Sequence, residues 1–262
     1  MSDYTKLRDS NLELFRIVTM IVIVAHHYVV NSGILPVILQ NYPSAKSLFL
    51  LLFGCGGKTG INCFVLITGY FMCTSQITMR KFLKLLLGVE FYNFLFLMFF
   101  AISGYVELTP KYVYESLMPI TSIKYDFVGC YLVFFCFIPV LNILVNGMNK
   151  KQHLLLTGLC LLVFSAFPSV LINVNYSYVS WFMVVYLIGS YLRLYPPQWS
   201  LNRKCVTIGL ISSIVLSLTS VWVGTKIDFM FNKNLYYWFV SDSNKPLSIG
   251  TAVFALILLK NL

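Results

Sequence analysis

Asn11-Leu-Glu-Leu-Phe-Arg-Ile-Val-Thr-Met-Ile-Val-Ile-Val-Ala-His-His-Tyr28 is the segment around which the chain is organised. It predicts the cytoplasmic edge and the first half of a membrane-spanning helix. Arg16 lies at the entrance of this helix, and two histidines, His26 and His27, lie near its middle. Charged or titratable side chains are costly at that depth, so these residues are candidates for a functional site.

The composition of the whole chain supports a membrane location. Of its 262 residues, 58% are hydrophobic and only 11% are charged, whereas an average soluble domain is about 25% charged. We therefore expect an all-α, polytopic integral-membrane helix bundle. In a soluble chain the net charge of +10 would favour nucleic acid as a partner. Here, cationic loops that face the cytoplasm and anionic membrane lipids account for it, and no nucleic acid is expected.

Apolar runs of about 20 residues mark membrane spans. They predict about eight transmembrane helices, at residues 17–37, 59–76, 85–104, 127–147, 154–172, 179–195, 205–224 and 247–262. A further apolar stretch, 46–53, precedes the second span, and four glycines lie between Gly54 and Gly60. This segment is either one long broken helix or a short re-entrant piece, which requires protein around its backbone.

The distribution of Lys and Arg predicts the orientation. With a cytoplasmic N-terminus, twelve of the 19 basic residues lie at the inner ends of the spans and the other seven in outer loops. The twelve are Lys6, Arg8, Arg16, Arg80, Lys81, Lys84, Lys150, Lys151, Arg193, Arg203, Lys204 and Lys260. The chain stops at Leu262, directly after its last apolar run, so we expect residues 1–262 to be a single transmembrane domain that lacks its last helices.

Helical spacing separates the two histidines. Arg16 and His27 are three turns apart, on nearly the same face and about 16 Å apart along the axis, whereas His26 points about 80° away. Glu13 and Asn31 extend this polar stripe by one turn in each direction, which predicts a wet or protein-lined groove. Alternatively, Arg16 snorkels to lipid headgroups and His27 hydrogen-bonds a neighbouring helix.

These five residues form the first set of site candidates. His27, Arg16 and Glu13 are the catalytic candidates, and His26 and Asn31 are candidates for contacts to a substrate. An imidazole can act as a general base at neutral pH because its ordinary pKa is about 6.5.

The glycine-rich segment Gly54–Gly60 invites comparison with a phosphate-binding loop. The Walker A pattern needs a glycine six residues before its lysine, and Leu52 occupies that position relative to Lys58. The predicted topology also places Lys58 outside, away from cytoplasmic nucleotides. Close helix packing through small residues is the better interpretation.

Three cations, Arg80, Lys81 and Lys84, lie at the inner edge of the third span. They either set orientation and bind anionic lipid or bind a phosphorylated ligand such as a coenzyme A nucleotide, for which Arg80 and Lys84 are the candidates. Glu90, a few residues into the span, requires a partner or a proton there. It is either a structural partner of Arg16 or Lys84, or a substrate-binding residue.

The cysteines and histidines predict neither a metal site nor a bound cofactor. The seven cysteines form no Cys-x-x-Cys pair and lie mostly within apolar runs, which is typical of small buried hydrophobic residues. The three histidines have no zinc-type spacing to any cysteine.

With these residues in view, the sequence resembles the membrane-bound acyltransferase-3 family of bacterial integral-membrane O-acyltransferases. The signature of that family is an Arg followed by ten residues and a His in the first helix, here Arg16 and His27. Three further blocks fit, at residues 60–71, 125–142 and 181–193. In the block 125–142, Asp126 stands where we expect Trp. The usual spaced arginines are replaced by Arg80, Lys81 and Lys84, and the family normally continues for two more helices.

The resemblance implies an O-acetyltransferase in the bacterial cytoplasmic membrane. The donor substrate would be cytoplasmic acetyl-CoA or another acyl-CoA, and the acceptor a hydroxyl of a cell-surface glycan or lipid-linked sugar. His27 would act as general base or transient acyl carrier. Arg16, oriented by Glu13, would hold a CoA phosphate or position the thioester. Two other classes compete: a transporter or flippase of glycan precursors, and a non-catalytic membrane scaffold or sensor.

Overall fold

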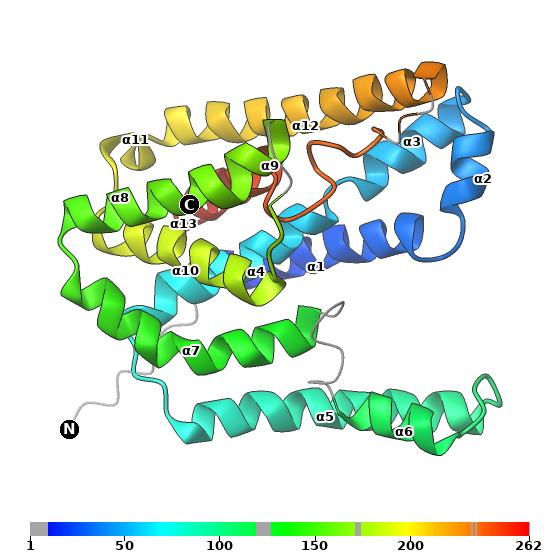
Figure 1. The fold of residues 1–262 in the computed structure, drawn as a ribbon, viewed down its shortest axis with the longest axis horizontal. Helices are drawn as coiled ribbons and strands as arrows, with labels where there is room; N and C mark the ends of the chain where they lie inside the picture. The colour runs from blue at the N-terminus through cyan, green and yellow to red at the C-terminus, as the bar shows by residue number, and fades with distance from the viewer. Residues whose placement is uncertain (1–9, 119–126, 171–173, 232, 234, 262) are drawn as a thin grey trace. The chain divides into compact units, whose positions relative to one another are not determined.

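The computed structural model describes residues 10–118, 127–170, 174–231, 233 and 235–261, and Figure 1 draws its ribbon. Within these ranges all regular structure is helical, which confirms the predicted all-α class. The helices are α1 (Ser10–Val30), α2 (Leu35–Gln40), α3 (Ala45–Gly54), α4 (Gly57–Met72), α5 (Met79–Ile102), α6 (Pro110–Leu117), α7 (Phe127–Gly147), α8 (Lys150–Leu161), the π-helical η1 (Leu162–Ala166), α9 (Phe167–Val170), α10 (Tyr178–Leu194), α11 (Gln198–Leu201), α12 (Arg203–Phe231) and α13 (Pro246–Lys260).

The long helices identify a polytopic membrane protein. Among the described residues, six helical segments are long and apolar enough to cross a membrane: Ser10–Val30, Ala45–Met72, Met79–Ile102, Phe127–Gly147, Lys150–Val170 and Arg203–Phe231. Two shorter apolar helices are α10 and α13. Each of the eight predicted spans therefore overlaps one apolar helical segment. The cytoplasmic location of the N-terminus stays a prediction.

The limits of the first span differ from the sequence prediction. The span was expected at residues 17–37, but α1 ends at Val30. Gly33 has φ +82°, a left-handed conformation that suits glycine and commonly stops a helix. Pro36 then lies in the first turn of α2, where a missing N–H costs no helical hydrogen bond.

The second span is a broken helix. α3 ends at Gly54 and α4 begins at Gly57, with only Cys55 and Gly56 between them, a segment that we call the α3–α4 break. Together α3 and α4 form the 28-residue apolar stretch Ala45–Met72. Of the two alternatives that the sequence left open, the structure has the long broken helix.

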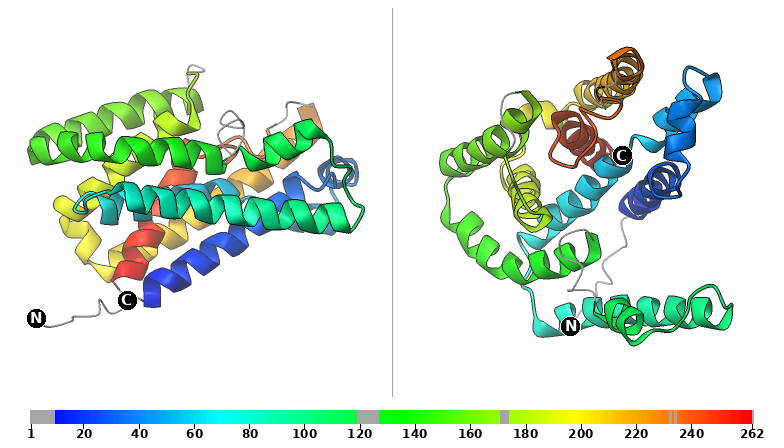
Figure 2. Two further views of the ribbon diagram at one scale, coloured as in Figure 1. Left: turned by 90° about the horizontal axis from the view of Figure 1, so that it is seen from below. Right: turned by 45° about the vertical axis from the view of Figure 1, so that its right-hand side comes forward.

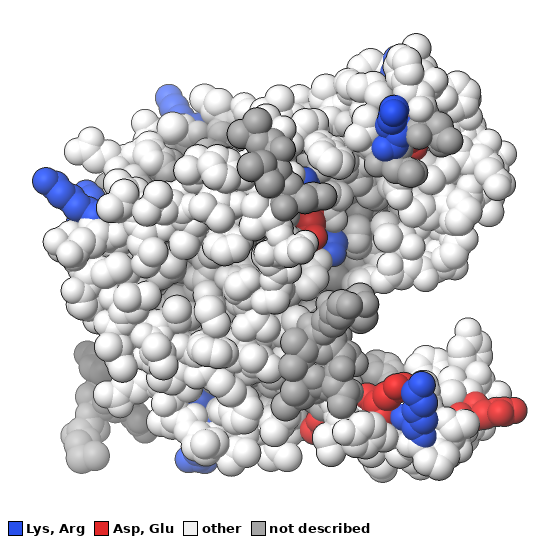
Figure 3. Space-filling model, in the orientation of Figure 1, with Lys and Arg blue, Asp and Glu red and all other residues white. Residues whose placement is uncertain are grey.

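Apolar side chains cover much of the helix surface. Leu97 is the only buried residue of α5, whose other side chains include many exposed Phe, Leu and Met residues. Figure 3 shows a face of the molecule on which few Lys, Arg, Asp or Glu atoms appear. Such a surface is typical of a helix that faces lipid and would be unusual in water.

The chain divides into two compact units. The first unit is Met1–Ile67, Gly158–Val174 and Leu194–Leu262, and the second is Thr68–Thr157 and Asn175–Arg193. In the first unit α1 packs on α3, and α12 packs on α13 (Figures 1 and 2). One cluster of its buried apolar residues comprises Val29, Ile38, Leu51, Val221, Tyr237 and Val240.

In the first unit, the loop before α13 supplies donors to the end of another helix. Pro168 has no N–H, so the carbonyl of Phe164, one α-helical turn earlier, loses its usual partner. The side-chain Nδ2 of Asn244 donates to that carbonyl at 2.7 Å. The buried Lys245 donates to the carbonyl of Pro168 at 3.1 Å and lies over the Trp238 ring, 4.7 Å from its centroid. The loop therefore caps the negative end of α9.

In the second unit, the side chain of Asn142 on α7 donates hydrogen bonds to carbonyls at the end of α4. Its Nδ2 donates to the carbonyls of Met72 (3.0 Å) and Ser75 (3.2 Å), just where α4 ends. The hydroxyl of Tyr186 on α10 donates to its Oδ1. Phe134 of α7 also packs edge-on against Tyr186, with ring centroids 5.9 Å apart. One amide thus joins three segments that are distant in sequence.

We predict that Asn142→Leu destabilises the protein by roughly 2 kcal/mol, because interhelical hydrogen bonds in membranes contribute on the order of 1 kcal/mol each. The substitution leaves two carbonyls and the Tyr186 hydroxyl without this partner, while side-chain volume is nearly kept. The free energy of unfolding in detergent measures the effect. Tyr186→Phe removes only one hydrogen bond and should lower the free energy of unfolding by less than half as much. If Asn142→Leu destabilised the protein no more than Tyr186→Phe does, the role of Asn142 at the end of α4 would be contradicted.

Candidate active site

Helix α1 presents two polar pairs, one near each end. At its start, Arg16 Nη1 donates to Glu13 Oε1 at 2.9 Å, one turn apart on the helix. The two side chains are 42% and 37% exposed, so solvent or a ligand can reach them. Glu13 in the first turn also complements the positive end of the helix dipole. The pair leaves the other guanidinium N–H groups of Arg16 available for an anion.

At the other end of α1, His27 and Asn31 form the second pair. Asn31 Nδ2 lies 2.6 Å from His27 Nδ1, and both residues are exposed. With the amide in this orientation, Nδ2 donates to Nδ1, and the neutral ring carries its proton on Nε2. If the amide rotates by 180°, its oxygen accepts from Nδ1–H and Nε2 becomes the basic nitrogen. Asn31 holds the ring in either state.

The position of His27 along α1 corrects the sequence prediction. We expected it near the middle of the span, but it lies in the last turn of α1, three residues before the helix ends at Val30. The cause is the stop at Gly33, which shortens the helix at this end. Between the two pairs, on the same face, Met20 and Val24 are exposed apolar residues. The polar stripe is thus two polar ends joined by an apolar middle.

The adjacent histidine lies in a different environment. His26 is partly buried, and its Nδ1 donates to the backbone carbonyl of Gly54 at 2.6 Å. The sequence suggested a contact to substrate for His26, whereas this nitrogen contacts the last residue of α3, just before the α3–α4 break. The two rings are nearly perpendicular, with centroids 5.9 Å apart.

The three remaining candidates belong to the second unit. Arg80 and Lys84 are exposed at the start of α5. Lys81, between them, folds back, and its Nζ donates to Ser75 Oγ at 3.0 Å and to the Gln76 carbonyl at 2.5 Å. Glu90 is half-buried, and within the described part of α5 it forms no ion pair with Lys84. The structure therefore groups five candidates on α1 and three on α5.

Sequence reasoning missed a polar cluster between α4 and the loop before α13. Lys58 Nζ lies 4.0 Å from Asp242 Oδ1, and the buried Asn62 donates to the carbonyl of Ser243 at 2.7 Å. Asn62 falls within the resembling block 60–71, so the block carried a signal, but its partner lies 181 residues away. No local pattern indicates such a pairing.

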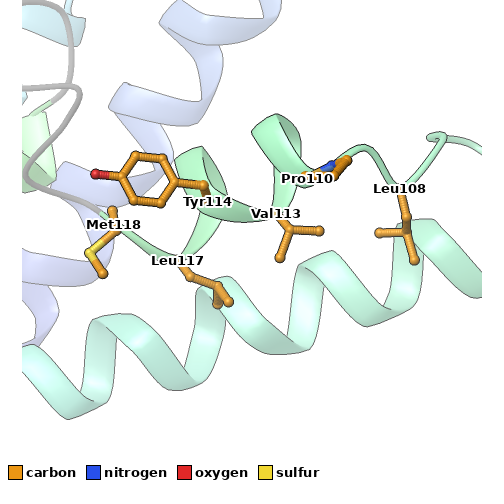
Figure 4. Close-up of a pocket in the computed structure, with 6 residues that line it drawn as sticks. All are labelled: Leu108, Pro110, Val113, Tyr114, Leu117 and Met118. Atoms are coloured by element: carbon orange, nitrogen blue, oxygen red, sulfur yellow. The ribbon is translucent and has the colours of Figure 1, made fainter.

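Other sites in the described ranges offer less chemistry. No group of three or more His, Cys, Asp or Glu side chains there can hold a metal ion. Burial raises the pKa of the Cys73 thiol, although the positive charge of Arg193 opposes the shift, so this thiol is a poor nucleophile. Figure 4 shows a shallow apolar hollow in the second unit, where the side chains of Leu108, Val113 and Leu117 point towards α5.

Comparison with known proteins gives one match. A family model described as an acyltransferase domain matches residues 9–262. No curated protein and no solved structure matches the chain.

We predict that Asn31→Ala makes His27 more reactive towards diethyl pyrocarbonate, which acylates an unprotonated imidazole nitrogen. The substitution removes the group that holds Nδ1, so the rate of modification at His27 should rise severalfold, as measured by peptide mass spectrometry. His153, which is fully buried, serves as the internal control and should not change. An unchanged rate at His27 would show that Asn31 does not restrain the ring.

Proposed function

Because the chain belongs to the acyltransferase family whose model spans residues 9–262, we propose that it is a membrane O-acyltransferase of the bacterial cytoplasmic membrane. It moves an acetyl or larger acyl group from cytoplasmic acyl-CoA to a hydroxyl of a cell-surface or lipid-linked glycan. The observation that carries this proposal is the His27–Asn31 pair, on the same face of α1 as the Glu13–Arg16 pair.

The reaction needs a group that first takes a proton and then gives it back. The acceptor hydroxyl attacks the thioester carbonyl, a C–O bond forms and the C–S bond breaks. His27 takes the hydroxyl proton and returns it to the leaving thiolate. Asn31 suits both stages when its amide is rotated so that its oxygen accepts from Nδ1–H, because Nε2 then takes the proton and gives it back while Nδ1 stays protonated. A transient acyl-His27 intermediate is the alternative route and uses the same residues.

Helix geometry supports a role for Arg16 at another part of the donor. Eleven residues of α-helix place Arg16 and His27 about 16 Å apart along the axis, so they cannot both touch the reacting carbonyl. A guanidinium that is oriented by Glu13 suits a phosphate of CoA, which it can bind through two N–H groups. Arg80 and Lys84 of the second unit are exposed cations whose chemistry, considered by itself, suits a phosphate. For Glu90 we retain the hypothesis of a substrate contact.

The competing hypothesis is a transporter or flippase of glycan precursors. It is compatible with a polytopic bundle, but membership of an acyltransferase family favours transfer over transport. It also gives no role to a basic imidazole that is held by an amide at the end of α1. We therefore do not adopt it.

We predict that His27→Ala reduces glycan O-acylation at least about a hundredfold, because general-base catalysis contributes typically 10²–10⁴-fold. Cells that express the full-length protein are compared by mass spectrometry of surface polysaccharide, at equal protein level. Tyr28→Phe, the neighbouring exposed residue, is the matched control and should acylate normally. Normal acylation by His27→Ala would refute the catalytic role.

We predict that Arg16→Lys raises KM for acyl-CoA by roughly tenfold and changes kcat much less, because a lysine keeps the charge but loses the bidentate fork. Steady-state kinetics of the purified protein separate the two constants. Arg203→Lys, an exposed arginine at the start of α12, is the control. A loss in kcat at constant KM would instead place Arg16 at the reacting carbonyl.

A further inference from the structure

The α3–α4 break creates a specific problem in a membrane. A helix that stops leaves its last carbonyls without N–H partners, and lipid cannot supply donors. Two carbonyls at the end of α3 receive side-chain donors from elsewhere in the first unit. The Tyr237 hydroxyl donates to the Leu51 carbonyl at 2.7 Å, and His26 Nδ1 donates to the Gly54 carbonyl at 2.6 Å.

Four glycines form the groove into which α1 fits. A Cβ atom at Gly54, Gly56, Gly57 or Gly60 would collide with a side chain of α1, so we call these positions the glycine groove. The facing side chains are Val29, Val22, His26 and Ile23, respectively. They lie along one face of the helix, and His26 is the polar residue among the four. The collision at Gly57 is with Cβ and the ring atoms Cγ and Cδ2 of His26.

The glycine groove and the hydrogen bond together fix the rotation of α1. His27 follows His26 by one residue and therefore points about 100° further around the helix. With His26 held in the groove, His27 is directed away from α3 and α4, where it is exposed beside Asn31. Rotation of α1 by one residue would place His27 in the groove and His26 outside.

We propose that His26 is a positioning residue, whose bond to the Gly54 carbonyl locks α1 in the glycine groove and so aims His27 at the reacting groups. The inference rests on the proposed function for its catalytic consequence. His26 acts through Nδ1–H on the backbone and makes no contact with substrate. Its role is distinct from the substrate contact that the sequence suggested.

Isosteric variants of the full-length protein test this role. The amide nitrogen of Asn can occupy the position of His Nδ1, whereas that of Gln reaches the position of Nε2. The acylation rate of His26→Asn should therefore be roughly tenfold higher than that of His26→Ala. The rate of His26→Gln should be close to that of His26→Ala, because small displacements of catalytic groups are costly. If His26 were a catalytic base, neither amide would restore activity and the acidic limb of the pH–rate profile would change.

A double-mutant cycle tests the contact with Gly57. Gly57→Ala should lower the acylation rate in the wild type but have no further effect in a His26→Gly protein, because glycine lacks Cβ, Cγ and Cδ2, the three His26 atoms that the new methyl group would meet. Gly88→Ala on α5, where a Cβ meets nothing within 4 Å, is the control. Additive losses in the double variant would overturn the proposal.

Alkylation of Cys55 gives a readout that does not depend on catalysis. Cys55 lies in the α3–α4 break and is partly buried. N-ethylmaleimide should label it faster in His26→Ala and His26→Gln than in the wild type and His26→Asn, as quantified by peptide mass spectrometry. Equal labelling in all four proteins would overturn the lock. If the wild type transferred no acyl group, the proposed function would fail, whereas the labelling would still decide whether His26 locks the break.

Discussion

Lipid offers no hydrogen bonds, and this constraint accounts for most of the polar contacts between helices in the structure. Wherever a helix stops or breaks, its carbonyls need a donor from the protein itself. His26 donates to the Gly54 carbonyl beside the α3–α4 break. Asn142 donates to the Met72 carbonyl at the end of α4, and Asn244 donates to the Phe164 carbonyl before Pro168. Each donor comes from another element, so each break also joins two segments. The hydrogen bonds at these breaks therefore fix the positions of helices that apolar packing alone would leave free to rotate.

The candidate site depends on one of these contacts, the hydrogen bond from His26 to the Gly54 carbonyl. Two adjacent histidines on α1 are divided between two environments by helical phase alone. The His26 ring donates to a backbone carbonyl and is partly buried, while the His27 ring is exposed and its Nδ1 lies beside an amide side chain. His26 thus fixes the direction in which the exposed His27 points. An exposed histidine on an unanchored helix would have neither a fixed direction nor a fixed partner.

Much of the fold could be predicted from the sequence, because runs of apolar residues report membrane spans directly. The ends of the helices could not be read as well. The first span ends at Val30 because Gly33 adopts a left-handed conformation, whereas the predicted span 17–37 ran through this glycine. The long-range donors were invisible for a different reason: Tyr237 and Leu51 are 186 residues apart, and periodicity carries no information about such pairs. The spacing of Arg16 and His27, by contrast, is a local property of one helix.

The glycine-rich segment shows why a motif must be interpreted in its structural context. In a soluble protein, glycines before a lysine suggest backbone amides that cradle a phosphate. Here the same glycines remove side chains so that α1 can approach, and the freed carbonyl of Gly54 binds an imidazole. The lysine that follows, Lys58, lies instead near the carboxylate of Asp242. Small residues in a membrane helix thus create a site where a neighbouring helix can pack. A polar group on that neighbouring helix determines whether the contact is packing alone or also fixes the direction of a catalytic side chain.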